Sequence, residues 1–135
     1  MEAAQSYSVD RSTLPKEVAE QVKDCKNVNS VVCERCQSVV LKPLAATFVQ
    51  KKAFLPHMKK KSDDQTIEDG EMLQNYWVVA DMFDFENVGF LKTVGTIKYL
   101  ICADCEVGPI GYQNLEDKTA LYVSLDRVKH LYVSQ

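Results

Sequence analysis

The sequence predicts an antiparallel or mixed β domain with only one or two short helices, and three observations favour this fold. The chain has 135 residues, of which 46% are hydrophobic and 26% are charged, a composition typical of one globular domain. From Val31 onward, short runs of β-branched and aromatic residues alternate with Pro, Gly, Asn and Asp. Two cysteine pairs of identical spacing lie far apart along the chain and could join its two halves.

The first 27 residues differ from the rest and are predicted to form an N-terminal extension, partly disordered or a short helix. Residues 1–11 are expected to be frayed, as chain ends often are. Pro15 suits the first turn of a helix, because the N–H that proline lacks has no partner there. A short amphipathic helix is predicted from apolar side chains that recur every three or four residues, namely Leu14, Val18, Val22 and Cys25.

Residues 28–135 are predicted to form the β domain. β-Branched and aromatic residues favour strands, and turn residues separate the runs. A polar segment near residues 59–72 holds a block of lysines, then a block of acids, then Gly70, and it is predicted to be a mobile surface loop. The predicted strands include residues 39–41, 46–49, 76–79, 97–101 and 120–123.

The two cysteine pairs, Cys33-Glu-Arg-Cys36 and Cys102-Ala-Asp-Cys105, are the strongest site signal in the chain. Two pairs with this spacing can place four sulfurs at the corners of one tetrahedral Zn²⁺. Four cysteine ligands leave no open coordination position, so the predicted zinc is structural and performs no chemistry. Because residues 37–101 lie between the pairs, the metal would clamp the ends of a whole domain, and structural zinc contributes on the order of 10 kcal/mol to folding.

Disulfides and a redox-active dithiol are the alternative interpretations of these cysteines. The chain does not begin with a basic segment followed by an apolar one, and no run approaches the roughly 18 apolar residues of a membrane span. We therefore expect a cytoplasmic protein without membrane insertion, in a compartment where disulfides are rare. A single pair would suit a thioredoxin-like dithiol, whereas two pairs favour a metal. Cys25 has no partner at ligand spacing.

Charge and motif content argue against several classes of function. The formal net charge is −3, and one Zn²⁺ with four thiolates would lower it to −5. This acidic balance disfavours nucleic acid as a partner, because phosphate contacts need clustered Lys and Arg. The chain has no P-loop motif with which to bind a nucleotide itself. His57 and His130 have no triad-type or metal-type companion nearby in sequence, so we expect surface histidines and predict no catalytic residue.

The segment of residues 81–90 is the other unusual feature. Phe83 and Phe85 alternate with Asp84 and Glu86, so on an extended strand the aromatic side chains would share one face. One interpretation is a strand with phenylalanines in the core and acids in water. The other is an exposed recognition surface, since aromatic residues are enriched at the centres of interfaces.

A series of motifs in this chain resembles the Rab-interacting factor family, the zinc-containing mammalian suppressor of a yeast Sec-type GTPase. The resemblance covers roughly residues 28–130, about three quarters of the chain. The motifs that carry it are Cys-x-x-Cys, Phe54-Leu55-Pro56, Asp81-Met82-Phe83-Asp84-Phe85-Glu86-Asn87-Val88-Gly89-Phe90, Cys102-Ala-Asp-Cys105-Glu-Val-Gly-Pro-Ile-Gly111 and Leu121-Tyr122-Val123.

The resemblance implies several coiled antiparallel β-sheets with a Cys₄ zinc at one end. It also implies a partner, namely Rab GTPases of the secretory pathway, whose nucleotide-free state members bind, releasing guanine nucleotide or chaperoning the empty Rab in vesicular transport and exocytosis. We expect no nucleic-acid binding and, since no heptads or large apolar face indicate a dimer, a monomer. The implied metal ligands are Cys33, Cys36, Cys102 and Cys105. The implied partner-binding residues are Asp104, Phe83, Phe85, Glu86, Asn87, Val88, Gly89 and Phe90, and either Phe83 or Phe85 could be the buried one of the pair.

Two other classes remain open at this point. A zinc-ribbon adaptor for nucleic acid would need a basic face, which the net charge disfavours. An enzyme similar to methionine sulfoxide reductases could share the paired cysteines and a β fold. Such an enzyme would need an additional low-pKa cysteine in the core of the fold, and Cys25 lies in the predicted extension.

Overall fold

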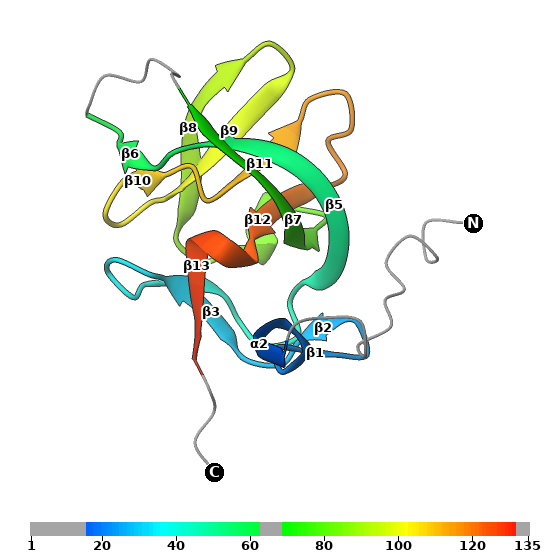
Figure 1. Cartoon of the computed structure of the whole chain (residues 1–135). Helices are drawn as coiled ribbons and strands as arrows, with labels where there is room; N and C mark the ends of the chain where they lie inside the picture. The colour runs from blue at the N-terminus through cyan, green and yellow to red at the C-terminus, as the bar shows by residue number, and fades with distance from the viewer. Residues whose placement is uncertain (1–15, 63–68, 132–135) are drawn as a thin grey trace.

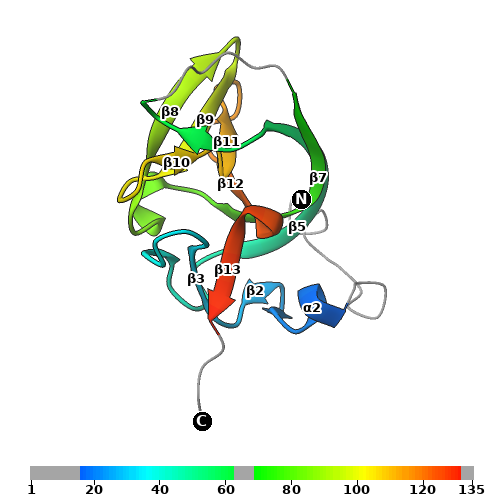
Figure 2. The same cartoon turned by 60° about the vertical axis from the view of Figure 1, so that its left-hand side comes forward.

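A computed structural model describes residues 16–62 and 69–131 of the chain, and within them the fold is mainly β, as predicted. Figure 1 shows the arrangement of the strands, and Figure 2 shows it from a second direction. No helix among the described residues is long and apolar enough to cross a membrane. The elements are α2 (Lys16–Ala19), β1 (Val22–Lys23), β2 (Lys26–Asn27), β3 (Ser30–Cys33), β4 (Val39–Leu41), β5 (Thr47–Pro56), β6 (Lys59–Lys60), β7 (Gly70–Val79), η2 (Met82–Asp84), β8 (Val88–Val94), β9 (Ile97–Cys102), β10 (Val107–Gly108), β11 (Gly111–Asn114), β12 (Leu121–Ser124), η3 (Leu125–Arg127) and β13 (Val128–Leu131).

The described strands form three sheets in which every pairing is antiparallel. The largest has eight strands in the order β1-β2-β5-β7-β12-β11-β9-β8. A three-stranded sheet has the order β13-β3-β4, and β10 pairs with β6. The longest pairing joins β5 and β7, and its register shifts between Gln50 and Ala53. A bulge of this kind bends the bulged strand, and β5 curves around one side of the molecule (Figure 1).

The large sheet buries side chains on both of its faces. In β7, Trp77 packs in one apolar cluster with Phe48, whereas its neighbour Tyr76 packs in a second cluster with Tyr112 and Tyr122. Successive residues of a strand point to opposite faces, so the continuous apolar run at the end of β7 indicates a strand covered on both sides. This explains why the predicted strands show no clean alternation of apolar and polar residues.

The three-stranded sheet and the large sheet each carry one cysteine pair to the same end of the molecule. Cys33 ends β3 and pairs with Val128 of β13, whereas Cys102 ends β9 and pairs with Val88 of β8. The loop after β3 and the loop between β9 and β10 lie side by side in both views (Figures 1 and 2). The fold therefore brings the two pairs together although residues 37–101 separate them.

The amphipathic helix predicted through Cys25 is wrong beyond its first turn. The helix α2 ends at Ala19, and Val22 lies in β1. Asp24 and Cys25 have φ angles of 52° and 66° and form the two-residue turn between β1 and β2. The spacing of apolar residues predicted a helix here. The chain instead forms a hairpin, because Asp24 and Cys25 adopt the left-handed conformation and β2 pairs with β5 of the large sheet. The residues predicted to be frayed, 1–11, lie outside the described ranges.

The loop predicted near residues 59–72 is bounded by strands on both sides and is shorter than predicted, because residues 59–60 and 70–72 lie in strands. Lys59 and Lys60 form β6, the Lys61 N–H donates to Glu106 O at 2.7 Å, and β7 begins at Gly70. Residues 63–68 lie outside the described ranges. The lysine block is therefore held beside the second cysteine loop.

His130 and Arg127 have structural roles that no local sequence pattern indicates. His57 is exposed as expected, but the prediction of a surface residue is wrong for His130, whose Nε2 accepts a hydrogen bond from the Trp77 indole N–H at 3.0 Å. The buried Arg127 guanidinium donates to the carbonyl oxygens of Pro56 and Pro109 at 2.9 and 2.8 Å and also bonds Glu71. These contacts fix the chain after β12 against the end of β5.

Candidate metal centre and the surface beside it

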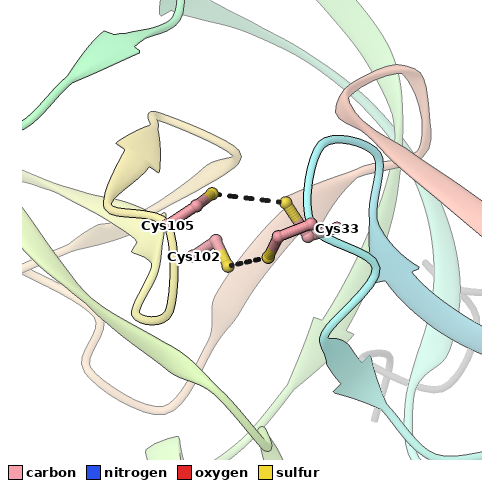
Figure 3. A group of neighbouring side chains, drawn as sticks. Cys33, Cys102 and Cys105 are labelled. Atoms are coloured by element: carbon pink, nitrogen blue, oxygen red, sulfur yellow. Dashed lines mark hydrogen bonds between the residues drawn. The ribbon is translucent and has the colours of Figure 1, made fainter.

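The four paired cysteines form one compact cluster, which we call the cysteine centre. Their sulfur atoms all lie within 4.8 Å of one another. The closest pairs cross between the two loops, with 3.6 Å from Cys33 Sγ to Cys105 Sγ and 3.6 Å from Cys36 Sγ to Cys102 Sγ (Figure 3). Ligands about 2.3 Å from a tetrahedral Zn²⁺ lie about 3.8 Å apart, so the sulfur positions fit such an ion.

The two cysteine loops have the same backbone design. In each, the residue after the second cysteine donates its N–H to the carbonyl of the first cysteine, Gln37 to Cys33 at 2.9 Å and Glu106 to Cys102 at 2.9 Å. Gln37 and Glu106 both adopt the left-handed conformation, with φ of 64° and 57°. This conformation is uncommon outside glycine and reverses the chain sharply, so each turn presents both of its sulfurs to the other loop.

The four thiols differ in exposure, and the pKa values of three of them are shifted. Cys33 and Cys102 are buried, Cys105 is half-buried, and Cys36 is exposed. Burial raises the pKa of the Cys102 thiol to about 12 and also raises that of Cys105, whereas hydrogen bonding to Ser38 lowers the pKa of Cys36 to about 6. A buried thiolate needs a compensating cation. The arrangement therefore suits a metal that deprotonates all four thiols on binding.

The strand predicted for the aromatic-acidic segment is wrong at Phe83 and Phe85, because the chain forms a short 3₁₀ turn there. The Asp81 carboxylate accepts the Phe83 N–H at 2.9 Å, and the Phe85 N–H donates to Met82 O at 3.1 Å. An aspartate in this capping position favours the turn over an extended chain. As a result Phe83 is 93% exposed, whereas Phe85 is 7% exposed and packs in the core.

The segment after the turn is hydrogen-bonded to β4, the strand that follows the first cysteine loop, and to the second cysteine loop. The N–H groups of Glu86 and Asn87 donate to the β4 carbonyls of Val40 and Val39 at 2.9 and 3.2 Å. The Ala103 N–H, between the second pair of cysteines, donates to Asn87 O at 2.8 Å. Residues 86 and 87 therefore bridge β4, just after the first cysteine loop, to the loop between Cys102 and Cys105.

Asp104 joins the two cysteine loops directly. It lies between Cys102 and Cys105, is exposed, and its Oδ2 accepts a hydrogen bond from the Ser38 hydroxyl of the first loop. Ser38 also contacts the Cys36 sulfur at 3.4 Å. We call the exposed group of Phe83, Glu86, Asn87 and Asp104 the acidic face. Ser38 was not a candidate from sequence, where a lone serine after a cysteine gives no signal.

The remaining predicted partner-binding residues lie on β8, next to the acidic face. Val88, Gly89 and Phe90 are half-buried. The Lys98 ammonium lies 3.9 Å from the centre of the Phe90 ring, a cation–π contact. Of the eight predicted partner-binding residues, Phe85 alone is buried, and it belongs to the apolar cluster against which Val88 and Phe90 pack.

Comparison with known proteins assigns the chain to a family. The sequence profile described as "Mss4 protein" matches residues 26–130. A "Guanine nucleotide exchange factor MSS4 homolog" of Drosophila melanogaster is 41% identical over 83% of this chain and 92% of its own length. The homolog of the same name in Schizosaccharomyces pombe is 34% identical over 67% of this chain and 87% of its own length. "Protein DSS4" of Saccharomyces cerevisiae is 30% identical over 53% of this chain and 68% of its own length. The chain therefore belongs to the Mss4 family.

Proposed function

We propose that this protein binds Rab-type small GTPases of the secretory pathway in the cytoplasm, acting as a monomer that prefers their nucleotide-free state. By doing so it promotes the release of guanine nucleotide, chaperones the empty GTPase, or does both. Two relatives that are named guanine nucleotide exchange factors, at 41% and 34% identity, support this proposal. The resemblance of the motifs described above to the Rab-interacting factor family supports the choice of Rab proteins.

The activity requires no bond to be made or broken by the protein. A protein that binds the empty GTPase more tightly than the loaded one must weaken nucleotide binding by the same factor, because the two equilibria are linked. The exchange factor therefore needs a surface that competes with the nucleotide or its Mg²⁺, and it needs no catalytic residue.

The same proposal assigns one structural Zn²⁺ to Cys33, Cys36, Cys102 and Cys105. The cross-loop sulfur distances of 3.6 Å support this assignment, since they are close to the edges of a ZnS₄ tetrahedron. When bound, the ion supplies a closed four-coordinate clamp. The chain itself holds the two loops together through the Ser38–Asp104 hydrogen bond and the hydrogen bond from the Ala103 N–H to Asn87 O.

The acidic face is the proposed contact surface, and the observation that carries it is the exposure of Phe83 and of Asp104, which lies between two cysteines of the cysteine centre. Phe83 offers an exposed aromatic anchor of the kind that dominates protein interfaces. Asp104 and Glu86 offer carboxylates that can compete for a lysine or for the Mg²⁺ region that nucleotide phosphates otherwise occupy. Asn87, with Val88, Gly89 and Phe90, forms the adjoining edge of the contact.

The proposal is tested by capture of Rab GTPases in three states. Immobilised full-length protein is mixed with a Rab that is GDP-loaded, GTP-loaded or stripped of nucleotide. We expect selective capture of the stripped form, at least tenfold over either loaded form. Equal capture of all three forms, or capture of none across a panel of Rab proteins, would contradict the proposal.

A further inference from the structure

An open depression of about 600 Å³ lies beside the exposed edge of the cysteine centre and shares no lining residue with the acidic face. Three cationic side chains line it, together with one acid and two of the cysteine ligands. The lining residues are Glu34, Arg35, Cys36, Lys60, Cys105, Val107 and Lys129. We call this site the basic depression.

The three cations come from distant parts of the sequence and are placed there by pairing of the backbone. Lys60 of β6 pairs with Val107 of β10, directly after the second cysteine loop. Lys129 of β13 pairs with Val32 of β3, next to Cys33. Arg35 lies inside the first cysteine loop, where its backbone N–H donates to Cys33 Sγ at 3.4 Å. Three separate sheet contacts or turns therefore converge on one side of the sulfurs.

The charge of the centre explains what these cations can do. Four thiolates with one Zn²⁺ carry a formal charge of −2, whereas the three cations and Glu34 of the depression sum to +2. The chain as a whole is acidic, at −3, so a local excess of positive charge runs against its average. The depression opens onto Cys36 and Cys105, the ligands that are not fully buried, where water, protons and competing reagents have access.

We propose that Arg35, Lys60 and Lys129 are positioning residues that supply the counter-charge of the tetrathiolate centre and thereby slow loss of its metal. This inference rests on the zinc assignment made above. Fixed positive charges stabilise thiolate over thiol and reduce the negative charge that a ligand sulfur offers to an attacking proton or alkylating agent. Once the metal is bound, the +2 of the depression and the −2 of the centre cancel. The depression then has no excess positive charge with which to bind another anion.

Metal transfer from the zinc-loaded full-length protein to an uncharged chelator, tetrakis(2-pyridylmethyl)ethylenediamine, tests the proposal. An uncharged chelator is needed because an anionic one would itself respond to the lysines. The test variant is Lys60→Glu/Lys129→Glu, which leaves Arg35 and its loop intact. The matched control is Lys52→Glu/Lys118→Glu, which makes the same charge change at exposed residues that do not line the depression. Lys60→Arg/Lys129→Arg keeps the charge and should behave as the wild type.

We expect metal transfer about tenfold faster in Lys60→Glu/Lys129→Glu than in the control at low salt, with the difference shrinking near 1 M salt, where charges are screened beyond about 3 Å. Alkylation by iodoacetamide should accelerate in parallel. Equal rates in the test and control variants would overturn the proposal. Tight binding of inorganic phosphate to the zinc-loaded wild type, lost in the test variant, would overturn it too. Zinc content is measured first, so a wild type that carries no zinc refutes the metal assignment itself.

Discussion

The acidic face and the basic depression border the same cysteine centre but differ in charge and composition. The acidic face has an aromatic side chain that is 93% exposed and two carboxylates, of which Asp104 accepts a hydrogen bond from Ser38 and Glu86 is ion-paired with Lys42. The basic depression has no aromatic residue among its lining residues and three cations. The first has the chemistry of a protein interface, and the second has the chemistry of a counter-charge. One centre can thus border both a partner surface and a stabilising counter-charge.

Loss of the cysteine centre should disrupt the acidic face and the basic depression together, and this is the largest expected effect. Cys102→Ser removes a buried ligand, so we expect zinc content near zero and loss of the folded state, because structural zinc contributes on the order of 10 kcal/mol. Zinc content by atomic emission and thermal unfolding by circular dichroism measure these changes. Cys25→Ser, which lies outside the cluster, is the control and should retain zinc. A folded, zinc-free Cys102→Ser protein would show that the metal is not the clamp.

Phe85 lies in the core next to the acidic face in sequence, and removal of its side chain should lower the stability of the fold. Phe85→Ala leaves a cavity in the main apolar cluster, so we expect a loss of about 3 kcal/mol in the free energy of unfolding by denaturant titration. An unfolding free energy within about 0.5 kcal/mol of the wild type would contradict this placement of Phe85.

Phe83 should show the opposite behaviour two residues away. Because its side chain is exposed, Phe83→Ala should leave the unfolding free energy unchanged but weaken binding of a stripped Rab by about tenfold or more. Leu44 is a second exposed apolar residue, with 65% of its surface accessible, and Leu44→Ala is the control for loss of apolar surface area. Calorimetric titration distinguishes the two variants. Equal affinities for both would remove Phe83 from the interface.

His130 gives a smaller, pH-dependent effect on the strand that supports the first cysteine loop. Burial lowers the pKa of His130 to about 4, against 6.5 in an unfolded chain, so between these values the unfolded state binds more protons. The contribution of neutral His130 to the free energy of unfolding is complete above pH 6.5 and is lost as pH falls toward 4. After allowance for partial exposure, the loss amounts to about 1–2 kcal/mol. His130→Gln keeps an acceptor for Trp77 without titrating, so the pH dependence of its unfolding should be weaker by that amount. An identical pH dependence in both proteins would contradict the assignment.

Much of this arrangement could be predicted from sequence, and the failures have physical causes. The β class and the four clustered cysteines follow from local patterns, since strand propensity and C-x-x-C spacing depend on near neighbours. The side chains of Phe83 and Phe85 could not be assigned, because one aspartate cap converts a predicted strand into a 3₁₀ turn. Residues 22–25 were assigned to a helix because apolar spacing does not register pairing with a distant strand. The convergence of Arg35, Lys60 and Lys129 depends on the pairing of β13 with β3 and of β6 with β10, and no local sequence pattern indicates pairing between such distant segments.

The most direct test of the account is the rate of nucleotide release from a Rab in the presence of Asp104→Asn. Asparagine keeps an oxygen that can accept the Ser38 hydrogen bond and removes only the charge, so zinc content and unfolding temperature should match the wild type. Glu116→Gln, at an exposed acid on the β11–β12 turn, is the matched control. With release of a fluorescent GDP analogue as the readout, we expect the release rate to fall at least tenfold for Asp104→Asn and to stay unchanged for Glu116→Gln. Wild-type release by zinc-loaded Asp104→Asn would contradict it.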